Sequence, residues 1–159
     1  GMGVCYRTNA FGNPLRQFDE FERDEIIDKY YRPHHQSLAQ AVQNELEISG
    51  KALIIDCHSF SDTPLPHEDS QTTPRPDICI GTDNFHTPSK LLTDAITYFE
   101  SCEYIVKVNT PFAGTLIPID YYQLDNSVQG IMIEINRDLY RDDFDEVRDN
   151  ITQWLETLV

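Results

Sequence analysis

The sequence predicts a three-layer α/β fold, with a mixed, mostly parallel sheet flanked by helices. Four short apolar runs alternate along the chain with segments in which apolar residues recur at helical spacing. This alternation favours parallel pairing, because the helix between two parallel strands crosses back over a face of the sheet. With 159 residues, 40% of them hydrophobic, the chain is long enough to bury a core, and we expect a single domain over residues 2–159.

The first helical segment opens with a start signal. Asp19 is followed three residues later by Glu22, which is the spacing of a capping box. Pro33 predicts a kink or a new start, because proline cannot donate the helical hydrogen bond. Apolar residues continue at helical spacing through Val42 to Gly50, and glycine is typical of a helix end. We expect this last part to pack one face on a core.

Prolines and glycines bound the remaining elements. Strands are expected at four places: 52–57, 78–80, 104–108 and 128–135. Helices are expected from Thr87, with Pro88 at the first helical position, and from about Asp142. The proline-rich, polar stretch 59–76 predicts a long irregular loop, a kind that usually serves function in compact domains and that is placed to cover a site.

The charge balance limits the partners. The chain carries 27 acidic and 12 basic residues, for a formal net charge of −15, so nucleic acids and anionic membrane surfaces should be repelled. A small anionic substrate would need a few arginines to overcome this field locally. No run is apolar enough to span a membrane and no signal-peptide pattern is present, so we expect a cytoplasmic protein.

The four cysteines indicate reduced thiols. They are Cys5, Cys57, Cys79 and Cys102, and no two of them form a CxxC pair. Cys57 and Cys79 lie within apolar, strand-like runs. We therefore expect buried thiols and no disulfide framework.

The most informative segment is Asp56-Cys57-His58-Ser59, where the first apolar run ends. A buried strand that ends here delivers a carboxylate and a histidine to an edge of the sheet, where α/β proteins carry their chemistry. Because side chains alternate along a strand, Asp56 and His58 share a face, and the carboxylate can orient the imidazole or a ligand bound to it. The alternative is a histidine satisfied by a nearby backbone group.

A second candidate is Glu134, in the apolar run 131–135. An unpaired buried carboxylate costs several kcal/mol, so Glu134 should be paired, bound to a metal or placed at a catalytic surface. An ion pair with Arg137, three residues later, or with another arginine is the structural alternative. Arg75 and Asp77 form another charged pair at a strand end. This pair is about as compatible with a structural salt bridge as with a role in substrate binding.

The third cluster is Tyr30-Tyr31-Arg32-Pro33-His34-His35. Its aromatic rings and histidines could line a pocket. Consecutive helical histidines point in different directions, however, so at most one of His34 and His35 belongs to a site. His67 and His86 lie in expected loops, where a solvated or hydrogen-bonded histidine is the simpler interpretation.

Taken together, these segments resemble the N-formylglutamate amidohydrolase family, zinc-dependent hydrolases related to the zinc carboxypeptidase and aspartoacylase-like clan. The resemblance runs through five segments in family order: YYRPHH (30–35), DCHSF (56–60), RPDICIGT (75–82), NTPFAG (109–114) and IEINRDLY (133–140). A lone DxHS motif is weak, but five segments in order over nearly the whole chain are specific.

The resemblance implies a phosphorylase/hydrolase-like fold of the zinc exopeptidase type and the hydrolysis of N-formylglutamate to formate and glutamate, a reaction of histidine degradation. By the same resemblance, His58 would be a zinc ligand, Glu134 the base that deprotonates the metal-bound water, and Asp56 the partner of His58. The residues implied for the anionic substrate and its oxyanion are Ser59, Arg75, Asn136 and Arg137. A related hydrolase with another acyl or peptide substrate stays open.

The chain departs from the family in one respect. In this clan an early histidine-then-carboxylate motif supplies zinc ligands, and no histidine of this chain has Asp or Glu three positions later. Either the ligand set is rebuilt from His34, His35, His67 or His86, or the chain is an N-terminally incomplete copy, non-catalytic or able only to bind an anion. We expect zinc to be absent or weakly bound, and uncovered sheet surface to favour a homo-oligomer.

Overall fold

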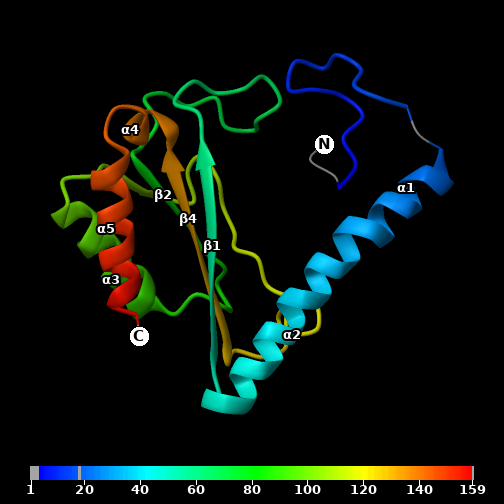
Figure 1. Ribbon diagram of the computed structural model, residues 1–159. Coiled ribbons are helices and arrows are strands. Elements are labelled where there is room, and N and C mark those ends of the chain that lie inside the picture. The colour runs from blue at the N-terminus through cyan, green and yellow to red at the C-terminus, as the bar shows by residue number, and fades with distance from the viewer. Residues whose placement is uncertain (1–3, 18, 159) are drawn as a thin grey trace.

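The computed structural model describes residues 4–17 and 19–158, and in them helices lie on both faces of a sheet (Figure 1). The strands are β1 (Ala52–Phe60), β2 (Ile78–Gly81), β3 (Val106–Val108) and β4 (Val128–Asn136). The helices are α1 (Glu20–Ile26), the π-helical turn η1 (Ile27–Tyr31), α2 (Arg32–Ser49), α3 (Ser89–Ser101), α4 (Arg137–Asp142) and α5 (Phe144–Glu156). The predicted α/β class is confirmed.

The sheet is mixed and mostly parallel, as predicted. Its order is β1-β4-β2-β3, with β1 parallel to β4, β2 parallel to β3, and β2 antiparallel to β4. Because β2 runs against β4, the start of β2 lies beside the end of β4, and Ile78 is the register partner of Ile135. Three segments therefore meet at one end of the sheet. Two of them end β1 and β4, and the third leads into β2.

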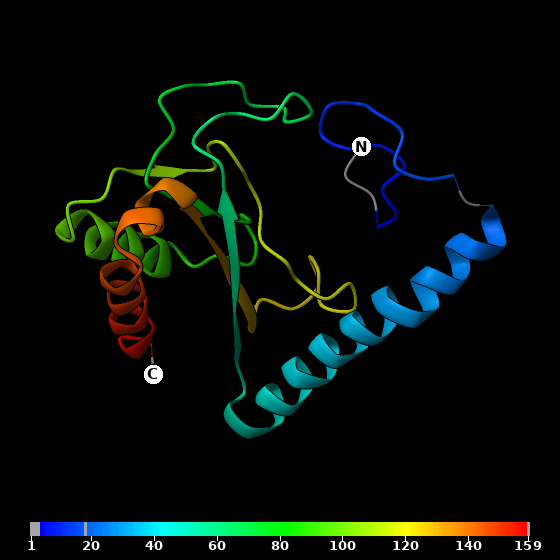
Figure 2. The same cartoon turned by 45° about the horizontal axis from the view of Figure 1, so that its top comes forward.

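The two faces of the sheet have different coverings. Figure 2 shows α2 on one side of the sheet and α3 with α5 on the other. The α3/α5 side holds the larger apolar core, built from Ile78, Ile80, Ala95, Phe99, Ile131, Ile133 and Trp154. On the α2 side, Val42 packs with Ala52, Ile117 and Val128 in a smaller cluster. Since side chains alternate along strands, Asp56, His58 and Glu134 belong to this α2 face.

A continuous helical arm runs from α1 through η1 to α2 (Figure 1). The predicted capping box is present, with mutual bonds between Asp19 and Glu22. The arm does not break at Pro33, because the wide turn η1 precedes it and the Arg32 amide donates to the Ile27 carbonyl. No residue of α1 or η1 is buried, and only Val42 is buried in α2. Among the described residues, no helix combines the length and apolarity needed to cross a membrane.

Several local predictions need correction. β1 continues to Phe60, so Ser59 and Phe60 belong to the strand, not to the loop. Cys57 is exposed, because β1 is an edge strand with β4 as its neighbour, whereas Cys79 is buried as predicted. Pro88 is the N-cap of α3 and not its first helical residue. Helix α4 was not expected; it begins directly after β4, because the Asn136 side chain accepts the Asp138 amide as a cap.

The loop 110–118 packs tightly on the α2 face at Gly81. A Cβ atom placed on Gly81 would lie 2.2 Å from the Gly114 carbonyl oxygen and 2.3 Å from Met132 Cε. Gly81→Ala should therefore lower the free energy of unfolding by about 3 kcal/mol, at the upper end of overpacking. The comparison is Gly50→Ala, where the space is open and only the left-handed φ of 74° is strained, at about 1 kcal/mol. Urea unfolding measures both losses. Equal losses of unfolding free energy in Gly81→Ala and Gly50→Ala would contradict the close approach of the loop 110–118 to Gly81.

Candidate functional site

Asp56 and His58 form a hydrogen-bonded pair at the C-terminal half of β1. His58 Nε2 lies 2.8 Å from Asp56 Oδ1, and the other carboxylate oxygen accepts the Leu116 amide at 3.1 Å. The side chain of His58 is 51% exposed and that of Asp56 only 16%. Asp56 is thus fixed from two sides, and it holds one ring nitrogen of a histidine that faces solvent.

Glu134 lies beside this pair on the neighbouring strand. It is the register partner of His58, on strands that are about 4.8 Å apart, so the two side chains share the α2 face. Glu134 is 7% exposed, and its Oε2 is buried without a hydrogen-bond partner among the residues that the structure describes. Burial raises the pKa of this carboxyl above its usual value, with a smaller contribution from Asp56, while His58 and Arg137 act in the opposite direction.

Cys79 is the neighbour of Glu134 on the other side, and the sequence analysis gave it no role. It is the register partner of Glu134 on β2 and is fully buried, with its Sγ 3.2 Å from the Phe112 carbonyl oxygen. Burial raises the pKa of the Cys79 thiol above its usual value, which disfavours the thiolate. That Cys79 lies beside Glu134 follows from the antiparallel register of β2 with β4 and has no signal in the sequence. Glu134 therefore lies between an exposed imidazole and a buried thiol.

Arg75 is held by the loop 59–76. Its guanidinium pairs with Glu68 and donates to the carbonyls of Ser61, at 2.9 Å, and Ser70, at 3.1 Å. The side chain is 1% exposed, and its guanidinium carbon lies 5.7 Å from the ring centroids of both Phe60 and Phe112. The expected partner was Asp77, whose carboxylate instead accepts the Ile105 amide. Of the two roles left open by the sequence, this geometry is that of a salt bridge, with Nε of Arg75 buried and unpartnered.

Arg137 and Asn136 end β4 in different environments. Arg137 is exposed and donates to Ser59, through Nε to Oγ at 3.2 Å and through Nη2 to the carbonyl at 2.9 Å. It does not pair with Glu134, which was the structural alternative. Asn136 is buried, and its amide donates to the Pro76 carbonyl at 3.2 Å and to Asp62 at 3.3 Å. Ser59 thus anchors the Arg137 guanidinium, which stays near solvent. Asn136 ties the end of β4 to Pro76 and Asp62.

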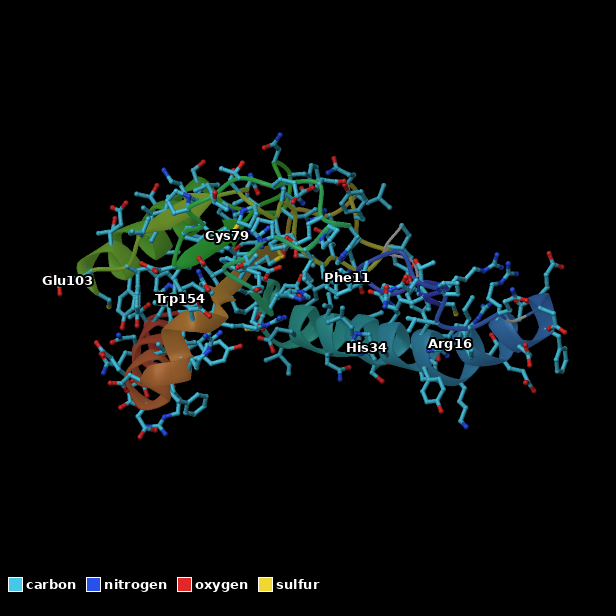
Figure 3. All side chains as sticks on the ribbon, turned by 90° about the horizontal axis from the view of Figure 1, so that it is seen from above. Phe11, Arg16, His34, Cys79, Glu103 and Trp154 are labelled. Atoms are coloured by element: carbon cyan, nitrogen blue, oxygen red, sulfur yellow. The ribbon has the colours of Figure 1, made fainter. Side chains whose placement is uncertain are left out.

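Three of the other histidines belong to other elements than His58. His86 is fully buried, donates from Nδ1 to the Val128 carbonyl at 2.7 Å and accepts the Gln123 amide at Nε2, so it is the hydrogen-bonded histidine of the simpler interpretation. His34 and His35 lie on the helical arm, where Figure 3 labels His34 well away from Cys79 in the sheet. Within residues 4–17 and 19–158, no three His, Cys, Asp or Glu side chains are grouped so as to hold a metal ion.

Comparisons with known proteins agree with this architecture. The sequence model of a family described as N-formylglutamate amidohydrolase matches residues 1–141. A crystal structure of N-formylglutamate amidohydrolase from Ralstonia eutropha JMP134 is similar, with a TM-score of 0.69 and 23% identity over 80% of this chain and 47% of that chain. The gene product Atu2144 from Agrobacterium tumefaciens is similar with a TM-score of 0.67 and 19% identity, over 96% of this chain and 62% of that chain. No curated protein matches the sequence.

Both likenesses fall below 25% identity, so they concern the fold. The chain spans less than two thirds of the length of either solved structure. The site itself rests on the residues described above.

Proposed function

Because the chain belongs to the N-formylglutamate amidohydrolase family, we propose that the face formed by Asp56, His58 and Glu134 is an amidohydrolase centre. Its substrate would be an N-acyl amino acid, most simply N-formylglutamate. The observation that carries the proposal is Glu134, a buried carboxylate with an unpartnered oxygen and a raised pKa, next to an exposed histidine. A group of this kind suits proton transfer near neutral pH.

The proposed chemistry is the attack of water on the acyl carbonyl carbon. The Glu134 carboxylate accepts a proton from the attacking water as the new C–O bond forms. The same proton passes to the amide nitrogen as the C–N bond breaks, which releases the acid, formate for a formyl substrate, and the free amino acid. His58, held by Asp56 at 2.8 Å, faces solvent where the acyl group would lie.

Arg137 is the cation best placed to assist. It is exposed, anchored on Ser59, and near enough to Glu134 to lower the pKa of that carboxyl. We assign it to the oxyanion or to a substrate carboxylate. Arg75 was the other candidate, but its guanidinium already has Glu68 and two carbonyls as partners, and reaching a substrate would require breaking that set.

The residues present do not by themselves fit a zinc site of the usual kind. Catalytic zinc ordinarily needs three protein ligands, and the described part of the chain brings no such trio together. Among the described residues, none of the four histidines other than His58 belongs to a group of three His, Cys, Asp or Glu side chains that could hold a metal ion. No step of the proposed chemistry is therefore assigned to a metal.

We expect protein purified without chelator to contain well below one zinc per chain. One histidine beside one carboxylate offers little to offset the dehydration of the ion. Elemental analysis of the protein, before and after dialysis against zinc and then against zinc-free buffer, measures the ratio. A stable ratio of about one zinc per chain would show that other donors complete the site.

The incomplete donor set favours a second candidate, a non-catalytic relative that binds a small anion. The exposed Arg137 would then be the binding group. This protein would bind N-formylglutamate without releasing formate.

The test of the proposed function is formate release from N-formyl-L-glutamate by the purified full chain. We expect slow release, below the roughly 1 to 10³ s⁻¹ typical of enzymes, and a further fall of about 10² to 10⁴-fold in Glu134→Gln. Release equal to that of buffer, from folded protein with zinc supplied, would overturn the proposal in favour of the anion-binding candidate.

A further inference from the structure

A cavity of about 400 Å³ lies between the start of α2 and the segment 116–120, outside the reaction centre. None of Asp56, His58 and Glu134 lines it. Its size is within the range of small-molecule sites, about 300 to 1,000 Å³. The lining includes Tyr31, Arg32, His35, Ala39, Ile119 and Asp120. This size and this separate lining are those of a second ligand site.

The helical wall of the cavity carries rings that core packing does not explain. No residue of η1 is buried, and Tyr31, its last residue, is 42% exposed. The rings of Tyr31 and His35 nevertheless lie 4.1 Å apart in this wall, and π-helical turns are frequent at functional sites. His35 is half-buried, whereas His34 is exposed and does not line the cavity. This wall therefore offers two rings on which a flat apolar group can pack.

The opposite wall is apolar and held in place. It is formed by Leu116, Ile117, Pro118 and Ile119. Ile117 and Pro118 are buried, and Ile117 belongs to the apolar cluster on the α2 face of the sheet. Ile119 is 80% exposed, so this wall keeps apolar surface that the core does not cover. A ligand that fits between the two walls therefore needs an apolar body.

The charges of the lining favour a ligand with a single negative charge. Arg32 pairs with Asp28 at 2.6 Å, but both side chains are about two-thirds exposed, so the pair is weak and a carboxylate can exchange for Asp28. His35 adds a ring N–H donor on the same wall. Asp120 also lines the cavity and repels a second negative charge. The lining therefore favours a monocarboxylate over a dicarboxylate.

We propose that this cavity is a second ligand site, separate from the reaction centre, and that it binds small apolar monocarboxylates such as an aromatic acid. The apolar body lies between Tyr31 and the wall 116–119, and the carboxylate lies beside Arg32. The inference does not depend on the proposed hydrolysis.

One hydrogen bond links the cavity to the reaction centre. The Leu116 amide, in the apolar wall, donates to Asp56, and Asp56 holds His58. A ligand that displaces Leu116 therefore changes the environment of His58 as well. The site is thus placed to regulate the chemistry that takes place at His58.

The test is a titration of the ¹⁵N-labelled full chain with benzoate, followed by backbone amide NMR. We expect saturation below about 10 mM, with shifts at 31–39 and 116–120 and smaller shifts at 56–58. Benzyl alcohol, which has the ring without the charge, and terephthalate, which has a second carboxylate, should each bind at least about twofold more weakly. Equal binding of the three probes would overturn the assignment to monocarboxylates.

Two pairs of variants locate the site. Ala39→Phe fills the cavity from α2 and should abolish saturable binding, whereas Gln40→Phe, on the adjacent exposed residue outside the lining, should leave it within about twofold of wild type. Arg32→Gln should weaken benzoate by about two- to fivefold, the range of an exposed ion pair, and leave benzyl alcohol unchanged. Its control is Arg23→Gln, because Arg23 pairs with Asp24 on the same arm and does not line the cavity.

Three results would each overturn the site. They are no saturation up to about 10 mM, shifts absent from both walls, and equal binding by Ala39→Phe and Gln40→Phe. Shifts in both walls with none at 56–58 would overturn the link to His58. Formate release, present or absent, tests only the proposed hydrolysis, so the failure of one proposal is distinguishable from the failure of the other.

Discussion

Replacing Glu68 with glutamine is expected to lower the free energy of unfolding by about 3 to 5 kcal/mol, the cost of breaking a buried ion pair. The Arg75 side chain is 1% exposed and that of Glu68 8%. Glutamine keeps the shape of the side chain but leaves the guanidinium charge buried with two carbonyls as its remaining partners. Guanidinium chloride unfolding measures the loss.

The control for this substitution is Asp94→Asn on α3. Asp94 pairs with Lys90, and both side chains are more than half exposed, so its removal should cost no more than about 0.5 kcal/mol. If the two variants lose equal stability, Arg75 is accessible to solvent, and its predicted role in binding the substrate regains support.

Replacing Glu134 with glutamine should have two opposite effects. Formate release should fall by about 10² to 10⁴-fold, the usual contribution of a general base, because an amide cannot accept the proton. Stability at neutral pH should rise, because the substitution removes a buried carboxylate with no partner at Oε2. Urea unfolding at pH values from about 4 to 8, together with formate assays, measures both effects.

The sign of the pH dependence follows from the raised pKa of Glu134. A carboxyl with a raised pKa in the folded state contributes stability that is full below its ordinary pKa of about 4.3 and is lost as pH rises through the folded value. The advantage of Glu134→Gln should therefore be absent at acid pH and grow toward neutral pH. The control is Glu45→Gln on the exposed side of α2, which removes no buried charge. A variant less stable than wild type at pH 7 would show that Glu134 has a partner.

The central features of the fold could be predicted because strand periodicity is a strong signal. Alternation puts Asp56 and His58 on one face, and the charge in the apolar run around Glu134 marks a second strand end. The register of β1 and β4 then makes His58 and Glu134 direct neighbours, and convergence at one edge follows. Their chemical roles stay predictions.

The remaining features depend on contacts between distant segments. The antiparallel direction of β2, which brings Cys79 next to Glu134, depends on the path of the loop 59–76 and has no signal in the strand itself. The Arg75 partner comes from that same loop. The exposure of Cys57 follows from the edge position of β1, which periodicity does not reveal. Likewise, the helical spacing of apolar residues in α1 and η1 suggests a buried face, but every residue of these two helices is at least partly exposed.

Glu134 can act as the base only if its buried carboxylate, which has no partner at Oε2 among the described residues, is available to take a proton. The most direct test is a ¹³C NMR titration of the Glu134 carboxyl carbon in the full chain, assigned by its loss in Glu134→Gln. We expect a midpoint above the ordinary glutamate value of about 4.3. A midpoint at or below that value would mean that a cation or hydrogen-bond donor holds the ionised form, and Glu134 would then be a structural partner and not the base.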